Sequence, residues 1–443
     1  MIKKLKKYSK TVYFSVLTIT ALVISVLAVM LFWNVASFQP SSTSQTIYFA
    51  DNISPSHRLL VDLFNKKHAG KIKVIPIDLP FEKFSTNERK ELLIRYLRSK
   101  SDKIDVFSVD QIWVPRFAKW TEPLNKYITP AQSAQIHEQA LKTCYYKNNL
   151  VALPLYFDIG MLYVNNKVIQ KIPNHTKIMQ KLENFITWED FVSLGIDIKK
   201  NKQPFYLFAA DDYEGLMCSF VELLASQNKQ LFKGDSIRLQ TKECKKSLQL
   251  LVDLVNKYGL SPKSVLEARE SQCYRTFISE DGFFLRGWSG LDAWYKYVIA
   301  PVDVSDDYTI VPVPHFSGGR PASIVGGWNL MLSKYSTKKS EAMEFIRFLI
   351  SEEAQKIMYE NGGYLPVNKS IYDDEKYCSK NPQIELYKKL IVTGVHRPFL
   401  DKYTRCSDIL AHYLNRAIAK EISVDEALAT AEQVINSGEF FIK

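Results

Sequence analysis

The sequence predicts an α/β protein of two lobes, preceded by one N-terminal transmembrane helix. Three observations lead to this prediction. At 443 residues the chain can bury more than one core. Strand-like and helix-like segments alternate from residue 46 onward, an order typical of a largely parallel sheet. The first 50 residues combine a basic start with a long apolar run.

The N-terminal segment predicts attachment to the cell membrane. Residues 1–10 contain five lysines and no acid, and no charged residue occurs from Thr11 to Ala50. The apolar run Tyr13–Trp33 is long enough to cross a bilayer, for which about 20 residues are needed, and the lysines would keep the N-terminus in the cytoplasm. We therefore expect a single-pass protein of the cell (inner) membrane with its binding domain in the periplasm or outside the cell, divided at this end into a cytoplasmic basic tail (1–10), a transmembrane anchor or uncleaved signal (11–36) and a linker (37–45).

A cleaved signal peptide is the alternative interpretation of the same segment. The hydrophobic part of a signal peptide usually has about 7 to 15 residues, which is shorter than the run found here. A weak cleavage site near Ala36 keeps this alternative open.

Charge and cysteine content exclude several classes of function. The net charge is +11, but five of these charges lie in residues 1–10 and the other basic residues are scattered, so the sequence does not predict nucleic-acid binding. Six cysteines occur without a CxxC spacing, and no phosphate-binding loop, GxSxG or HExxH motif is present. We therefore expect no cofactor, no metal site and no ATPase activity in this chain. Outside the membrane a disulfide is conceivable, and Cys378 with Cys406 is the suggested pair.

The elements after residue 45 follow from periodicity. Strands are expected at Thr46–Ala50, Lys71–Ile77 and Asp105–Val109. Helices are expected between them, at Leu59–Phe64 and at Leu92–Leu97. Two further strands, Leu153–Tyr156 and Met161–Val164, are expected to flank a turn at Phe157–Gly160. Thr187 and Ser423 are expected to cap helices.

The segment from Ile324 to Val367 is the most informative. Two glycines precede a short apolar strand, Asn329–Ser333, which predicts that Trp328 lies at the edge of the strand. Two helices should follow, the first capped by Ser340 and the second capped by Ser351 and terminated by Asn361-Gly362-Gly363.

This segment, with the order Gly-Trp strand, EAMEFIRFL, SEEAQ and Gly-Tyr-Leu-Pro, resembles the one that marks the family 1 extracellular solute-binding proteins of ABC importers. The resemblance covers nearly all of residues 46–443. It implies the periplasmic-binding-protein fold, in which the chain crosses a hinge between the lobes three times and ligand binds in the cleft between them. It places lobe one at 46–155 plus 320–365 and lobe two at 156–319 plus 366–443.

Five further segments resemble the trehalose/maltose/sucrose-type branch of that family, namely DVFSVDQIWVPRFAKW, ALPLYFDIGMLYVNNKV, DDYEGLMC, FFLRGWSG and HRPFLDKY. The resemblance implies ligand binding by eight residues: Asp110, Tyr156, Asp158, Glu214, Trp288, Gly327, Trp328 and Arg397. It implies a sugar as ligand, and ABC permease subunits with their ATPase as partners.

These residue types suit a sugar. Carboxylates accept hydrogen bonds from two hydroxyls, an arginine donates to adjacent hydroxyls, and aromatic rings pack on the C–H faces of the sugar ring. Each residue also has a structural alternative. Both tryptophans could belong to the core, Asp110 and Asp158 could cap elements, Glu214 could be a solvated acid at a helix start, and Arg397 could form a structural ion pair.

The sequence also departs from the branch pattern. The loop after the first strand, Asp51–Arg58, has no Glu, whereas the branch often has one there that touches ligand. FFLRGWSG lacks the Pro-Tyr of the branch, so the identity of the sugar stays open. The sequence leaves two alternative functions open: a membrane-anchored ligand-sensing module for a signalling partner, and a glycoside hydrolase using two of Asp110, Asp158 and Glu214.

Overall fold

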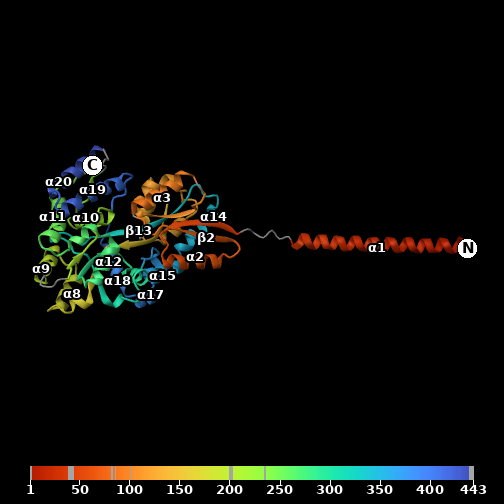
Figure 1. The fold of residues 1–443 in the computed structure, drawn as a ribbon, viewed down its shortest axis with the longest axis horizontal. Helices are drawn as coiled ribbons and strands as arrows, with labels where there is room; N and C mark the ends of the chain where they lie inside the picture. The colour runs from red at the N-terminus through yellow and green to blue at the C-terminus, as the bar shows by residue number, and fades with distance from the viewer. Residues whose placement is uncertain are drawn as a thin grey trace.

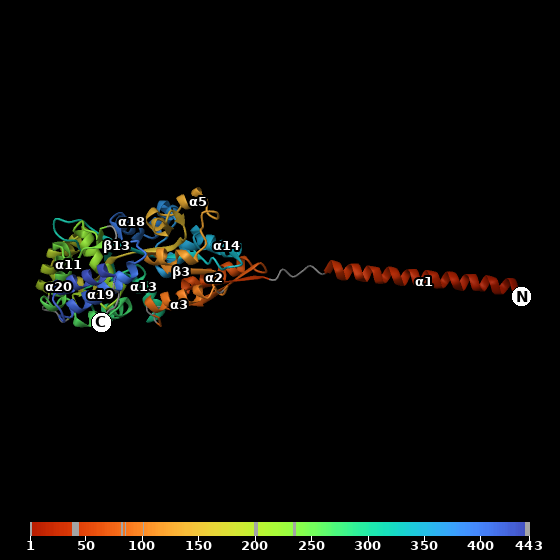
Figure 2. The same cartoon turned by 90° about the horizontal axis from the view of Figure 1, so that it is seen from above.

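The computed structural model describes residues 2–37, 44–80, 83–84, 86–100, 102–198, 203–233 and 236–438. Helix α1 (Ile2–Ser37) contains one stretch, Tyr13–Met30, that is long and apolar enough to cross a membrane, and none of this stretch is buried against the rest of the chain. Figures 1 and 2 show α1 apart from the body of the protein. Most of the predicted linker, residues 38–43, lies outside the described residues.

The first of the two larger sheets is built mainly from the N-terminal part of the chain. Its strands follow the order β14-β13-β3-β1-β2, with β6 also paired to β13. β1 pairs parallel to both β2 and β3, as the alternating pattern predicts, whereas β13 is antiparallel to β3 and β6. The strands are β1 (Gln45–Asp51), β2 (Ile72–Asp78), β3 (Val106–Asp110), β6 (Leu153–Ile159), β13 (Ser323–Leu332) and β14 (Gly394–His396). Helices α2 (Pro55–Lys67), α3 (Thr86–Arg98) and α14 (Lys339–Leu349) accompany this sheet (Figure 1).

The second sheet has the order β12-β7-β11-β8 and forms the centre of the other lobe. Its strands are β7 (Met161–Asn165), β8 (Tyr206–Leu207), β11 (Phe284–Gly287) and β12 (Tyr308–Val311). Figures 1 and 2 place α11, α19 and α20 at this end, away from α2 and α14. The helices of this end are α8 (His175–Glu183), α9 (Trp188–Ile198), α10 (Glu214–Ser226), α11 (Lys242–Asn256), α12 (Glu270–Ser279), α19 (Tyr403–Ile418) and α20 (Val424–Ser437). The two-lobed α/β fold expected from the sequence is confirmed.

The remaining elements are short or lie between the lobes. They are α4 (Val114–Phe117), α5 (Pro130–Ala134), α6 (Glu138–Leu141), α7 (Asn166–Ile169), α13 (Leu291–Val298), α15 (Glu352–Gly362), α16 (Lys369–Asp373), α17 (Glu375–Lys380), α18 (Gln383–Val392), and the two-residue strands β4 (Tyr145–Tyr146), β5 (Asn149–Leu150), β9 (Phe232–Lys233) and β10 (Ser236–Ile237). Helix α15 packs on α2 and also contacts α13.

The chain passes between the sheets where β6 leads into β7, and again where β12 leads into β13. The turn expected at Phe157–Gly160 is wrong, because β6 continues through Ile159 and only Gly160 separates it from β7. Phe157 and Asp158 remain extended because they pair with Gly327 and Gly326 of β13. A third passage follows α15, through β14 on the edge of β13, to α19 and α20.

A buried ion pair lies beside the first two of these passages. Arg286 of β11 donates to both carboxylate oxygens of Glu222 in α10, at 3.2 and 2.8 Å. Glu222 Oε1 also accepts the backbone N–H of Ile324, at 3.0 Å. A Cβ atom on Gly160 would lie 2.0 Å from this same oxygen, so only glycine fits between the strands at this point. The pair therefore joins α10 and β11 to the start of β13.

The segment after residue 323 differs from its prediction in two details. β13 runs unbroken through both glycines, so Trp328 lies within a central strand, paired on both sides, and not at its edge. Ser340 does not cap α14, whose N-cap position is Lys338. The caps at Ser351 and Ser423 are confirmed by their bonds to the N–H groups of Ala354 and Glu426, and Gly363 ends α15 with φ +66°.

The suggested disulfide between Cys378 and Cys406 is wrong. Both thiols are free and buried, as are the other four. Cys378 lies 3.5 Å from the carbonyl oxygen of Tyr372, and it packs as a small apolar residue.

Candidate functional site

Arg397 joins groups from three distant parts of the chain. It follows β14, is 3% exposed, and donates from Nη1 to Glu214 Oε1 at 2.8 Å and from Nη2 to Asp110 Oδ1 at 2.9 Å. Glu214 Oε1 also accepts the hydroxyl of Tyr403 at 2.9 Å. Burial raises the pKa of Glu214, and the charge of Arg397 opposes that rise. The first turn of α10 thus faces the end of β3 across one guanidinium group.

Trp328 lies in β13 between two other predicted site residues. Its neighbours in the sheet are Asp110 of β3 on one side and Tyr156 of β6 on the other. Gly327 has φ +141°, and a Cβ atom there would lie 2.7 Å from the carbonyl oxygen of Tyr156. This position therefore requires glycine, because any side chain would separate β13 from β6. Trp113 packs edge-on against Trp328, with ring centroids 5.7 Å apart.

Asp158 lies where β6 leaves the first sheet and accepts three hydrogen bonds on one oxygen. The donors are the backbone N–H of Ile159 and the N–H and hydroxyl of Ser289, each at 2.9 Å. Burial raises the pKa of Asp158 to about 7, while the bonds from Ser289 act in the opposite direction. Since Ser289 follows β11 of the second sheet, these bonds link the two lobes.

Trp288 projects from the end of β11 toward the first sheet. A Cβ atom on Gly326 would lie 3.0 Å from Cζ3 of this ring, so the glycine leaves room for it. The indole Nε1 donates to Glu270 at 3.3 Å, and the guanidinium of Arg286 lies 4.2 Å from the ring centroid. Trp288 is thereby held at the point where the lobes meet.

The structure brings all eight sequence-predicted residues into one region. Four of them are neighbours through β13 (Asp110, Tyr156, Gly327 and Trp328), two are joined to Asp110 through ion pairs (Arg397 and Glu214), and two face Gly326 (Asp158 and Trp288). Among the described residues, no group of three or more His, Cys, Asp or Glu side chains is arranged as a metal site. A separate cavity of about 470 Å³, lined by Arg116, Tyr146 and Asp401 among others, contains none of the eight.

Four site-adjacent residues were not predicted. Asp51 ends β1, His57 and Arg89 lie in α2 and α3, and Tyr364 follows α15. The guanidinium of Arg89 lies 4.4 Å from the centroid of Trp328, and the Tyr364 ring lies 4.3 Å from that of Tyr156. A signal for Arg89 was available in the sequence, because it shares an i, i+4, i+8 stripe with Leu93 and Leu97, both buried.

The charged side chains in this region give the site a negative net charge. The carboxylates belong to Asp51, Asp110, Asp158 and Glu214, and the guanidinium groups to Arg89 and Arg397. Burial lowers the pKa of His57, so its imidazole is neutral. Asp158, whose pKa is raised to about 7, is only partly ionised at neutral pH. The other three carboxylates still outnumber the two guanidinium groups, and this small excess of negative charge disfavours an anionic ligand.

Comparison with known proteins identifies relatives of the whole domain. The family model for bacterial extracellular solute-binding protein matches residues 48–356. A curated relative from Deinococcus radiodurans, described as a probable ABC transporter-binding protein, is 24% identical over 395 residues, covering 84% of this chain and 87% of the relative.

Solved structures share the fold. Maltose-bound MalE3 of T. maritima superposes with a TM-score of 0.79 at 23% identity, covering 89% of this chain and 100% of that one. An ABC transporter solute-binding protein of Thermotoga lettingae, bound with alpha-D-tagatose, gives a TM-score of 0.77 at 22% identity, covering 89% of this chain and 99% of that one.

Proposed function

Because the chain belongs to the bacterial extracellular solute-binding proteins, we propose that it is the sugar-binding subunit of an ABC importer. Ligand is trapped between the two lobes and delivered to the permease, whose ATPase supplies the energy. The observation that carries this proposal is the convergence of Asp110, Asp158, Trp288, Trp328 and Arg397 where the two sheets meet. The two tryptophan rings, which can pack on the C–H faces of a sugar, lie beside carboxylate and guanidinium groups, which can hydrogen-bond to its hydroxyls.

We propose the lobe bounds of the family pattern, 46–155 plus 320–365 and 156–319 plus 366–443, with the first crossing placed at Gly160, where β6 leaves the first sheet. The two lobes close over the ligand by bending at the crossings at Gly160 and at the start of β13. The permease then binds the closed form of the protein. Neither nucleic acid nor a cofactor has a role in this cycle.

The excess of negative charge in the site disfavours acidic sugars, and we propose a neutral sugar or polyol as the ligand. Titration calorimetry of the full chain in detergent micelles, against maltose, trehalose, D-tagatose and ribitol, tests the proposal. We expect binding of at least one of the four with a Kd at or below about 10 μM, which corresponds to about −7 kcal/mol. Trehalose 6-phosphate should bind more weakly than trehalose. A folded protein that binds none of the four ligands refutes the assignment to a sugar or polyol.

A hydrolase is disfavoured by the partners of the three carboxylates that would perform it. Asp110 and Glu214 are both bonded to Arg397, and one oxygen of Asp158 accepts three bonds. Such carboxylates are poorly placed as a proton donor facing a nucleophile or base across a glycosidic bond. We therefore propose that the chain is not an enzyme. Release of nitrophenol from an aryl glycoside, abolished by Asp158→Ala, would reverse this assignment.

The apolar helix α1 anchors the domain to the cell membrane, with the basic tail in the cytoplasm. A tether raises the local concentration of the binding domain near its permease. Intact-mass measurement of the protein recovered from membranes distinguishes the two forms: the anchor retains residues 1–36, and a cleaved signal loses them. Co-purification of two permease subunits supports transport, whereas co-purification of a signalling protein supports the sensing alternative.

A further inference from the structure

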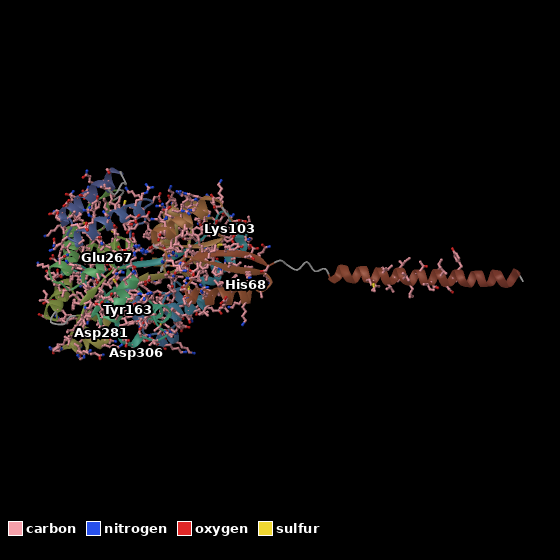
Figure 3. The ribbon with its side chains drawn as sticks, viewed as in Figure 1. His68, Lys103, Tyr163, Glu267, Asp281 and Asp306 are labelled. Atoms are coloured by element: carbon pink, nitrogen blue, oxygen red, sulfur yellow. The ribbon has the colours of Figure 1, made fainter. Side chains whose placement is uncertain are left out.

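The end of lobe one to which α1 is joined is formed by the starts of its parallel strands. β1, β2 and β3 run parallel, and β13, which is antiparallel to β3, ends beside the start of β3. Gln45, the first residue of β1, therefore lies at the same end as the turns that follow α2 and α3 and the loop that precedes α14. Figure 3 shows His68 and Lys103, from two of these segments, on the side of the domain nearest to α1. The proposed ligand site lies at the opposite ends of the strands, because Asp110 ends β3.

This end of lobe one is basic. It is formed by residues 65–73, 95–100, 102–105 and 333–342, which contain eleven Lys and Arg against three Asp and Glu. We call the exposed surface of these segments the basic face. Three further acids pair with its side chains, namely Glu122, Glu344 and Glu353. Even with these acids counted, the face keeps an excess of five positive charges.

The excess on this face accounts for most of the charge of the domain. The net charge of +11 includes five lysines in residues 1–10, so the rest of the chain carries +6. Lys71 and Lys73 are exposed at the start of β2, the edge strand of the sheet, and Lys100 and Lys334 are exposed just after α3 and β13. Like charges gathered on one surface repel each other, so the face gains free energy when an anionic surface approaches it.

The anchor keeps the basic face close to a bilayer. The apolar stretch of α1 ends at Met30 and the helix ends at Ser37. The chain from Ser37 to Gln45 can span at most about 28 Å. The start of β1, and with it the basic face, therefore stays near the lipid headgroups at a high effective concentration.

The composition of the face fits lipid better than protein. Lysine is depleted in protein–protein interfaces, whose centres are apolar and aromatic. Lysine side chains instead reach toward phosphate headgroups, and each one near an anionic membrane favours binding by about fivefold. Tyr96, which is 41% exposed, also belongs to the face, and tyrosine is enriched at the level of the headgroups.

We propose that the basic face docks on the anionic lipid headgroups of the membrane that holds α1. Because the ligand site lies at the opposite ends of the strands, a docked lobe one leaves the cleft clear of lipid and lobe two able to close. This interaction goes beyond the proposed sugar binding and rests on the proposed anchor. Failure of the anchor would appear separately, as loss of residues 1–36 from the intact mass.

The test uses the full chain reconstituted in vesicles of phosphatidylcholine alone or of equal parts of phosphatidylcholine and phosphatidylglycerol. A membrane-impermeant acylating reagent modifies exposed lysines, and mass spectrometry gives the rate at each position. Lys71, Lys73 and Lys100 should react at least about threefold more slowly in the anionic vesicles, and salt at about 1 M, which shortens the screening length to about 3 Å, should abolish this difference. The internal reference is Lys177, which is exposed on α8 of lobe two and should react equally in both vesicles.

Charge reversal distinguishes docking from proximity alone. Lys71→Glu/Lys73→Glu should remove the protection of Lys100 in anionic vesicles. The matched control is Lys171→Glu/Lys177→Glu, which makes the same change of charge at exposed positions of lobe two and should leave Lys100 protected. Exposed substitutions of this kind change stability little, and the salt comparison decides the question without any substitution.

Three results would overturn the proposal. The first is equal reactivity of Lys71, Lys73 and Lys100 in the two kinds of vesicle. The second is equal protection by phosphatidylcholine alone, which would make the contact independent of charge. The third is protection that requires added permease, which would make the face a docking surface for protein. Sugar affinity measured on the same samples should not differ between vesicles, so docking can fail while the proposed function holds.

Discussion

Gly290 and Gly363 are in backbone contact across the two lobes, so closely that a Cβ atom on Gly363 would lie 2.3 Å from the Cα atom of Gly290. Gly363 ends α15, and Gly290 precedes α13. We expect Gly363→Ala to prevent this approach of the lobes and to weaken sugar binding at least tenfold. Small-angle scattering should show a larger radius of gyration for the variant in the presence of sugar.

The control for this substitution must share its backbone strain. Gly363 and Gly70 have φ values of +66° and +78°, but a Cβ atom on Gly70 would meet nothing within 4 Å. Each substitution to alanine should cost about 1–2 kcal/mol of unfolding free energy from strain alone. Equal loss of sugar affinity in both variants would show that strain, and not contact between the lobes, is responsible.

Removing Arg397 should destabilise the fold more than removing any surface arginine. Arg397→Met leaves Asp110 and Glu214 buried without their cation, which should cost about 3–5 kcal/mol of unfolding free energy. Arg416→Met, which removes an exposed pair with Glu421, should cost at most about 1 kcal/mol. Urea unfolding followed by circular dichroism measures both.

A second substitution distinguishes charge from packing in this cluster. In Arg397→Met/Glu214→Gln one uncompensated carboxylate is gone, so part of the lost stability should return. If the double variant is no more stable than Arg397→Met, the guanidinium contributes through packing and its electrostatic role is contradicted.

Most elements were predictable because they depend on local signals. Apolar periodicity located β1, α2, β2, α3 and β3, and cap residues such as Ser351 and Ser423 located helix starts. The eight site residues came from motif resemblance, and their convergence reflects the strand pairings of β13. Their role in ligand binding remains a prediction.

What the sequence did not reveal depends on tertiary contacts. Phe157–Gly160 resembles a turn locally, but pairing with Gly326 and Gly327 keeps it extended. The cluster of Asp51, His57 and Arg89 was missed because each residue is unremarkable in its own segment, and only the packing of β1, α2 and α3 makes them neighbours. Arg397 looked equally like a ligand-binding group and a structural ion pair, and the structure places it in ion pairs.

Asp158 should make stability depend on pH. Burial raises its pKa to about 7 in the folded protein, against about 3.9 for an ordinary aspartate. Since the folded state binds this proton more tightly, the contribution of Asp158 to stability is complete below pH of about 4 and is lost as the pH rises through about 7. Asp158→Asn has no proton to lose at this position. Between pH 4 and 8 the unfolding free energy of the wild-type protein should therefore fall by at most about 4 kcal/mol relative to that of the variant.

The opposite sign is expected at Asp374. The N–H of Tyr377 holds the pKa of that carboxyl below its usual range, so its contribution is present at neutral pH and lost on acidification. Urea unfolding of wild type, Asp158→Asn and Asp374→Asn at a series of pH values measures both directions. A wild-type minus Asp158→Asn difference that stays constant from pH 4 to 8 contradicts the assignment to Asp158.

Trp328 should affect sugar affinity more than stability. Trp328 belongs to β13, which lies between β3 and β6, and its ring is only partly buried, with the Arg89 guanidinium 4.4 Å from the ring centroid. Trp328→Ala should weaken binding of the best of the four ligands by about 10- to 100-fold, or about 1.4–2.7 kcal/mol. The variant loses both the apolar area that the ring covers on the ligand and a ring contact worth about 0.5–1.5 kcal/mol beyond that area. Trp328→Phe, which retains a ring, should lose less. Calorimetry measures the affinities, and sugar-induced change in tryptophan fluorescence should shrink in both variants.

The matched control is Trp188, which packs against Phe191 and Tyr206 in the second lobe. Trp188→Phe should lower the Tm and leave the sugar affinity unchanged, because this ring is 5% exposed and lies in a core away from the eight site residues. If Trp328→Ala instead lowers the Tm and leaves the affinity unchanged, Trp328 is a core residue like Trp188. The cation–π contact with Arg89 then serves only to fill the space between β13 and α3, and recognition of sugar must depend on Trp288 and the second lobe.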